Sequence, residues 1–195
     1  MNRYIACALV VAGACSAPKN DQPTDNLADS TVENTDTLKY PDESHLKNVR
    51  MLTNGGDNAE AYWSFDNQML VFQSSNSAWD VECDQIYYFN PFEKTAIEET
   101  PKMISTGMGR TTCAYFMPGD TSVVYASTHL GNEACPPKPE RREDGKYVWP
   151  IYEDFDIFIT DLDGNITQQL TSEKGYAAEA TDSPNGAKIV FTSLR

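Results

Sequence analysis

Residues 183–193, SPNGAKIVFTS, contain a tight turn followed at once by a short apolar strand. Pro184 fixes φ at the value that the second position of such a turn needs, and Gly186 accepts the positive φ of a later position. Residues 188–192 are largely β-branched and aromatic, as in a buried central strand. With residues 178–181 as the strand before the turn, the stretch predicts a β-hairpin.

The same hairpin pattern occurs three times along the chain. Each copy has an aliphatic residue followed by Ser or Thr, a Gly-containing loop, a short strand, a turn and a β-rich run. Such recurrence indicates a repeat architecture. The aligned segments are residues 52–75, 104–128 and 170–195, with turns at 65–67, 117–120 and 183–186 and returning strands at 69–73, 123–126 and 189–192.

Two further strands follow each of the first two hairpins. Residues 84–89 align with 155–160 as a third strand, and residues 102–105 align with 167–171 as a fourth. The Asp-Leu-Asp-Gly stretch at 161–164 supplies a turn between them; it lacks the ligand spacing of a calcium loop. Four short antiparallel strands per repeat are typical of a propeller blade.

The motif at 183–193 resembles the TolB-type, WD-like β-propeller repeat of bacterial envelope proteins. Asp-Ile-Phe at 156–158, Asp-Leu-Asp-Gly at 161–164 and Leu-Thr at 170–171 match the same repeat. The resemblance covers about residues 45–195 and implies an all-β propeller of four-stranded antiparallel blades. It says little about function, because such repeats occur in scaffolds and as gates on peptidases.

We expect blades near residues 54–105 and 106–171 and an incomplete one at 172–195, so that about two and a half blades are present. Propellers have roughly four to eight blades. We therefore expect the sequence to be part of a longer protein. Residues 48–53 match the fourth strand of a blade that the sequence does not contain. Residues 189–193 would form an open apolar edge. A small sandwich of the same strands is the alternative.

Residues 1–15 have a positive start and an apolar run that is too short to span a bilayer, as in a secretory signal peptide. Cys15 follows Ala-Gly-Ala, which makes the segment resemble a lipoprotein signal with Cys15 as the lipidated residue; ordinary cleavage after Ala14 is the alternative. Residues 16–44 are rich in Ser, Thr, Asn, Asp and Pro and predict a disordered tether. Together they predict a bacterial periplasmic protein, anchored to the outer membrane through a lipid.

The chain carries 29 acidic and 15 basic residues, a formal net charge of −14. The sequence has no cluster of Lys and Arg residues that could bind the phosphates of nucleic acid, so we expect no nucleic-acid partner. We also expect no cofactor and no metal, since the cysteine spacing does not suit a zinc site.

Cysteines 83, 113 and 135 lie in the part that we expect to be folded, and export predicts a disulfide among them. All three lie towards the same face of the predicted ring, so any pair is possible. We favour Cys83–Cys135, in the connections between second and third strands of neighbouring blades, with Cys113 buried.

Residues 129–154 form an insertion that ends in three aromatic residues, Tyr147, Trp149 and Tyr152. They are candidates for a recognition loop, because loops on rigid scaffolds commonly carry binding sites. A solvated loop whose aromatics cover a blade edge is the alternative. The two histidines, His45 and His129, are expected to be solvated loop residues.

These features predict a non-catalytic binding or scaffold propeller of the cell envelope. We expect it to contact envelope proteins or peptidoglycan-associated lipoproteins, and the membrane only through a lipid anchor. The alternative is the N-terminal propeller part of a longer envelope hydrolase or peptidase. No Gly-x-Ser-x-Gly nucleophile motif accompanies the histidines.

Overall fold

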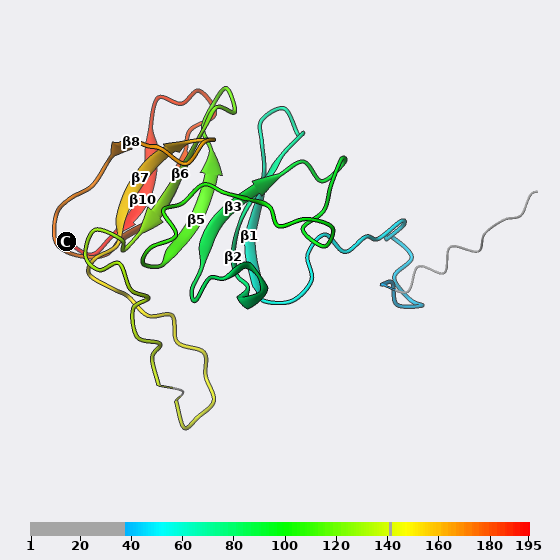
Figure 1. Ribbon diagram of the computed structural model, residues 1–195, viewed down its shortest axis with the longest axis horizontal. Helices are drawn as coiled ribbons and strands as arrows, with labels where there is room; N and C mark the ends of the chain where they lie inside the picture. The colour runs from blue at the N-terminus through cyan, green and yellow to red at the C-terminus, as the bar shows by residue number, and fades with distance from the viewer. Residues whose placement is uncertain (1–37, 141) are drawn as a thin grey trace, which may run out of the picture. The chain divides into compact units, whose positions relative to one another are not determined.

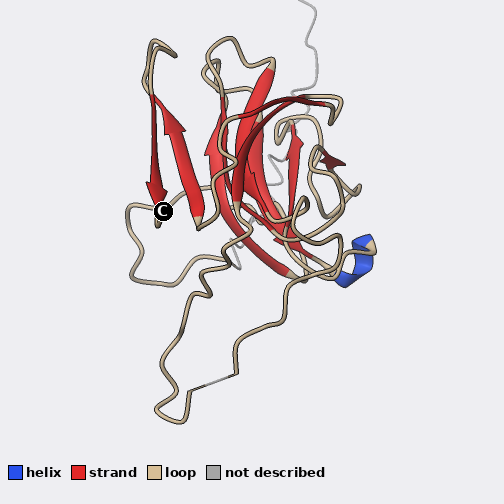
Figure 2. Ribbon diagram, turned by 90° about the vertical axis from the view of Figure 1, so that its left-hand side faces the viewer, coloured by secondary structure: helices blue, strands red, loops and turns tan. Residues whose placement is uncertain are grey.

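The computed structural model describes residues 38–140 and 142–195. The predicted signal peptide with Cys15 lies outside the described residues, as does most of the predicted tether. Residues 38–44 contain turns and bends and no strand. Within the described ranges the chain forms ten β-strands and a single 3₁₀ turn, which confirms the all-β class (Figure 2).

The strands form two four-stranded antiparallel sheets and a hairpin (Figure 1). In each sheet the strands lie in chain order, every strand antiparallel to its neighbours. No closed ring of sheets is present in the part of the chain that the structure describes. The first sheet contains β1 (Asp57–Trp63), β2 (Leu70–Ser75), β3 (Gln85–Phe89) and β4 (Lys102–Met103), with the turn η1 (Ser77–Trp79) before β3; the second contains β5 (Thr111–Phe116), β6 (Ser122–Ser127), β7 (Asp156–Asp161) and β8 (Ile166–Gln169); the hairpin is β9 (Ala177–Asp182) and β10 (Ile189–Ser193).

The turn between the first two strands has the same geometry in all three units. In each, the amide of the fourth turn residue donates to the carbonyl of the first, and that fourth residue has a positive φ. Asn, Asp and Gly tolerate this left-handed conformation best, and they are the residues found there. The bonds are Asn67 N to Ser64 O at 3.0 Å, Asp120 N to Met117 O at 3.0 Å and Gly186 N to Ser183 O at 2.7 Å.

The first strand of each unit is kinked by a β-bulge at the same place. Glu60, Cys113 and Glu179 occupy the left-handed region, with φ of 52°, 51° and 59°, and the strand register shifts beside each. The side-chain oxygen of Gln73 accepts hydrogen bonds from Thr112 Oγ1 and from the amide of Cys113, both at 3.0 Å. The strands near Tyr62, Ala114 and Glu179 therefore take equivalent places in successive units, as the repeats predict.

Apolar clusters join each unit to the next through these first strands. One lies between the two sheets, and two lie between the second sheet and the hairpin; the smaller contact beside the main one is formed by Ala126, Phe155, Tyr176 and Ala178. Burial of such apolar surface is the main favourable term in folding. The first cluster contains Val71, Ile86, Ile104, Ala114, Phe116, Val123, Tyr125 and Phe158, and the second contains Val124, Ile157, Ala177 and Ala180.

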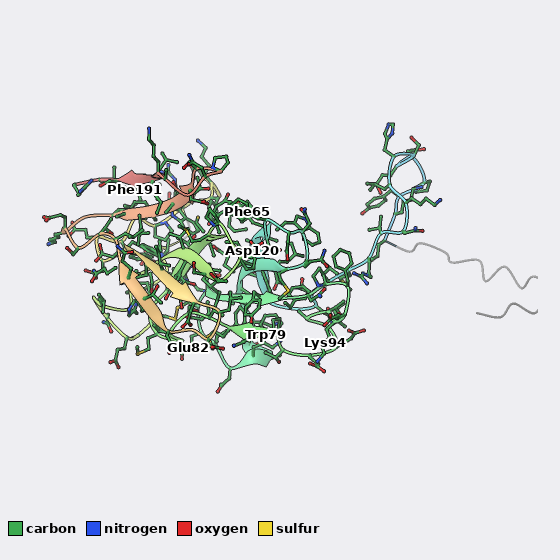
Figure 3. All side chains as sticks on the ribbon, turned by 90° about the horizontal axis from the view of Figure 1, so that it is seen from above. Phe65, Trp79, Glu82, Lys94, Asp120 and Phe191 are labelled. Atoms are coloured by element: carbon green, nitrogen blue, oxygen red, sulfur yellow. A yellow bond between two sulfur atoms is a disulfide. The ribbon has the colours of Figure 1, made fainter. Side chains whose placement is uncertain are left out.

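Asp120 adds a polar link between the two sheets, from the β5–β6 turn to the β1–β2 turn (Figure 3). Its two carboxylate oxygens accept hydrogen bonds from the amides of Phe65 and Asp66, at 2.8 and 3.0 Å. The hairpin lacks this link, because Gly186 stands at the position of Asp120 and has no side chain. Pro118, which stands at the position of Phe65, has no amide hydrogen to offer.

Asp120→Gly should lower the free energy of unfolding by about 1–2 kcal/mol, because two hydrogen bonds to a partly exposed carboxylate are lost. Glycine keeps the left-handed turn without strain, so the loss reports on the link between the sheets. Asp120→Asn, which retains an acceptor oxygen, should cost less. Urea unfolding measures both, and an Asp120→Gly protein as stable as wild type would contradict the assignment.

Candidate functional site

The β6–β7 connection, which contains the predicted insertion, forms one wall of a cavity of about 960 Å³. Figure 1 shows this long loop extending away from the strands. The opposite wall comes from β1 and the segment before it, from β2, and from the residues directly before β3 and β5. The lining residues are Thr53, Gly56, Asp57, Asn58, Ala59, Gln73, Ser75, Asp84, Arg110, Lys138, Pro139, Glu140, Arg142, Gly145, Lys146, Tyr147, Val148, Trp149, Pro150 and Tyr152.

The three aromatic residues that the sequence singled out all line this cavity. Tyr147 is 82 % exposed. Tyr152 is partly buried; its hydroxyl donates to the carbonyl of Pro137 at 2.6 Å, and its ring packs near that of Phe155. The insertion thus presents one exposed and two half-buried aromatic side chains to a single hollow.

A disulfide holds the insertion to the first sheet. The structure joins Cys83 and Cys135, whose Cα atoms are 6.0 Å apart, the pair that the strand order favoured. Next to it, the amide of Gly109 donates to the carbonyl of Glu133 at 2.7 Å. These contacts fix the first limb of the insertion relative to the sheet that forms the opposite wall of the cavity.

Gly131 lets the two limbs of the insertion meet near its base. A Cβ at this position would lie 2.4 Å from the side-chain carboxyl carbon of Asp154, closer than real Cβ contacts come. A larger residue would therefore push the limbs apart.

An ion pair between Asp84 and Arg110 forms the base of the cavity where the two sheets meet. The charged groups are 2.8 Å apart, and the two side chains are only 12 % and 11 % exposed. Burial raises the pKa of Asp84, and the neighbouring guanidinium opposes the rise. Sequence reasoning missed this pair, because the two residues are 26 positions apart and neither stands in a recognisable motif.

Cys113, which we expected to be buried, is a free cysteine and is half-buried in the structure. The bulge in β5 turns this residue out of the regular alternation of the strand. Burial raises the pKa of its thiol, and the carboxylates of Glu60 and Glu179 raise it further. The thiol is therefore protonated and weakly nucleophilic at neutral pH.

The prediction that His129 is a solvated loop residue is wrong. Its side chain is buried, its ring lies 4.6 Å from that of Phe158, and Nδ1 is 2.9 Å from the hydroxyl oxygen of Ser127. Ser127 is itself only 1 % exposed, so a substrate cannot reach its hydroxyl. The contact between His129 and Ser127 supports the start of the insertion. The other histidine, His45, is exposed, as expected.

The Asp161–Asn165 stretch forms the hairpin turn that the sequence predicts. Asp161 accepts hydrogen bonds from the amides of Asp163 and Asn165 and from the Asn165 side chain, each at 2.9 Å. These bonds lower the pKa of its carboxyl. Among the described residues no group of three or more His, Cys, Asp or Glu side chains is arranged to hold a metal ion. The same part of the chain contains no helix that is long and apolar enough to cross a membrane.

Replacing Cys83 and Cys135 together by serine should lower the free energy of unfolding by up to about 4 kcal/mol, from the chain entropy of the closed loop. The two residues are 52 positions apart. The insertion should lose protection first, which hydrogen exchange over residues 136–151 would detect. Cys113→Ser serves as the matched control, and equal protection in the double variant would rule out the anchoring role.

Acidification should destabilise the protein in part through His129. Burial lowers the pKa of this residue below its ordinary value of 6.5, although Asp156 opposes the change. Below pH 6.5 the unfolded state therefore binds more protons than the folded state, and stability falls with pH until the folded pKa is passed. His129→Gln should flatten this part of the curve of unfolding free energy against pH; an unchanged slope would show that His129 contributes nothing.

Comparison with known proteins adds no assignment to this site. No protein-family model matches the chain, and no curated protein matches it either. The resemblance to the TolB-type repeat stays a prediction, and the cavity beneath the insertion is characterised by its geometry and chemistry alone.

Proposed function

We propose that this protein is a non-catalytic binding or scaffold protein of the bacterial cell envelope, of the TolB-like β-propeller kind, and that it recognises its partner at the cavity beneath the insertion. One observation carries the proposal: Tyr147, Trp149 and Tyr152 converge on a cavity of about 960 Å³ from a loop that a disulfide holds to the sheets.

The scaffold suits recognition because it is rigid where the loop is attached. Fixing a loop before it binds reduces the ordering cost of association. Tyr and Trp then supply large contact areas with few rotatable bonds, and such residues dominate the affinity of many interfaces. An exposed ring such as that of Tyr147 is available to a partner without any rearrangement of the core.

The polar lining favours a polypeptide partner over a polyanion. Lys138, Arg142 and Lys146 lie on the loop wall, whereas Asp57 and Asn58 lie on the opposite wall. This mixture of both charges and amide groups complements a protein surface that also carries both signs. The formal net charge of the protein, −14, disfavours nucleic acid as a partner. Envelope proteins or peptidoglycan-associated lipoproteins are therefore the partners that we propose.

The envelope location and the propeller form part of the same proposal. The segment 1–15, with Cys15 as its lipidated residue, supports export and anchoring to the outer membrane. The recurring turns, the bulges at Glu60, Cys113 and Glu179 and the packing of each first strand on the preceding sheet support a series of blades.

Tyr147→Ala should weaken partner binding at least about tenfold, because truncation of a well-placed aromatic anchor costs about 1–2 kcal/mol or more. The partner is first isolated from bacterial envelope extracts on immobilised full-length protein, and its dissociation constant is then measured for each variant. Ile166→Ser, on β8 and away from the cavity lining, is the matched control. Equal affinity of wild type and Tyr147→Ala would contradict the assigned site, and hydrolysis of a bound envelope component by the pure protein would contradict the non-catalytic role.

A further inference from the structure

The disulfide between Cys83 and Cys135 lies in the wall of a second cavity, of about 450 Å³. The two cysteines are unequally covered: Cys83 is 2 % exposed, whereas Cys135 is half-buried. A thiolate exchanges with a disulfide by attacking one of its two sulfur atoms, so access to a sulfur atom decides where the reaction starts. The second cavity therefore gives a thiol from outside a route to the Cys135 side of the bond.

The second cavity is acidic. Its lining includes Asp80, Glu82 and Glu133, which are all exposed, and among the residues that the structure describes no Lys, Arg or His lines it. Carboxylates around an opening repel anions and attract cations, most strongly at low ionic strength. A thiol carried by an anionic molecule is thus disfavoured at this disulfide, and a thiol carried by a cationic molecule is favoured.

The surroundings of Cys83 make it the sulfur that leaves and stays away. Its Sγ atom lies 2.9 Å from the carbonyl oxygen of Gly109. A carbonyl oxygen accepts a hydrogen bond from a protonated thiol and so stabilises the thiol over the thiolate. Once released and protonated, Cys83 is a weak nucleophile and is slow to attack the sulfur of Cys135 again.

A short series of contacts links the disulfide to the cavity beneath the insertion. Two residues after Cys135, the carbonyl oxygen of Pro137 accepts a hydrogen bond from the hydroxyl of Tyr152 at 2.6 Å. Tyr152 lies on the second limb of the insertion and lines that cavity, as does Lys138 on the first limb. Cleavage of the disulfide therefore frees the first limb and removes the support that the first limb gives to Tyr152.

We propose that Cys83–Cys135 is a thiol–disulfide exchange site, reduced by a dithiol on a neutral or positively charged molecule, and that reduction releases the insertion. An effect of this release on partner binding rests on the function proposed above for the cavity beneath the insertion.

The exchange proceeds in two balanced steps. One thiolate of the reductant bonds to Cys135 Sγ, the bond between the two cysteines breaks, and its electron pair goes to Cys83 Sγ, which takes up a proton. The second thiolate of the reductant then attacks the reductant sulfur in this mixed disulfide and releases Cys135, which is protonated in turn. The dithiol is oxidised to a disulfide, and its two electrons reduce the two cysteines.

Exchange rates with a cationic thiol, cysteamine, and an anionic thiol, 3-mercaptopropionate, test the route. They are measured on the full chain at low ionic strength, by alkylation and mass-spectrometric mapping of Cys83 and Cys135. Glu82→Gln/Glu133→Gln should lower the ratio of the cysteamine rate to the 3-mercaptopropionate rate at least about fivefold, because two of the charges that distinguish these thiols are gone.

The matched control is Glu93→Gln/Glu173→Gln, which removes two exposed carboxylates outside the second cavity and should leave the ratio unchanged. The first cysteamine adduct should be on Cys135. An adduct that forms first on Cys83 would overturn the order of attack, and equal rate ratios in wild type and both double variants would overturn the acidic route.

Hydrogen exchange before and after reduction tests the release of the insertion. Residues 136–151 should lose protection on reduction and regain it on reoxidation, while β2 and β6 stay protected. Cys113→Ser should respond like wild type, because this thiol takes no part. Unchanged protection over 136–151, or a loss of protection throughout both sheets, would overturn the inference. A partner that binds neither redox form would contradict the proposed function, whereas hydrogen exchange alone decides the release.

Discussion

The structure depends on one recurring contact, the burial of the first strand of a unit against the sheet before it. Ala114 and Phe116 do this at the first junction and Ala180 does it at the second. The small side chains of Ala114 and Ala180 let the strands approach closely. A four-stranded sheet has two faces, and one such sheet alone would leave both in water. Stacking successive units removes apolar surface from water at every junction, which is why stability in repeat architectures comes largely from neighbours.

Polar contacts then fix the position of each unit. Gln73 accepts two hydrogen bonds from the bulge of the next unit, Asp120 reaches back to the turn of the preceding one, and Asp84 pairs with Arg110 where the sheets meet. Directional hydrogen bonds and ion pairs of this kind fix how one unit is aligned on the next, which apolar packing alone does not determine. The same region carries the disulfide and one wall of the cavity, so the candidate site is built on the junction between the two sheets rather than on an isolated loop.

The strands and turns could be predicted from the sequence because each depends on residues that are close together in the chain. Pro184 and Gly186 mark one turn, and the β-branched runs after each turn mark the second strands. It also singled out Tyr147, Trp149 and Tyr152, because aromatic residues in a charged insertion are unusual. It could not reveal the Asp84–Arg110 pair or the burial of His129, since both depend on contacts between segments that the sequence does not place side by side. Nor could it reveal that Cys113 is only half-buried, because this follows from the left-handed backbone conformation of a non-glycine residue.

The bulge at Glu60 affects how the outer border of the first sheet can pair with another extended chain. A straight strand at the border of a sheet offers a continuous row of amides and carbonyls to any other extended chain. On β1 the kink interrupts that row after Ala59, and the carboxylates of Asp57 and Glu60 repel a second acidic copy approaching in the plane of the sheet. The kink therefore disfavours the addition of a further strand along this border.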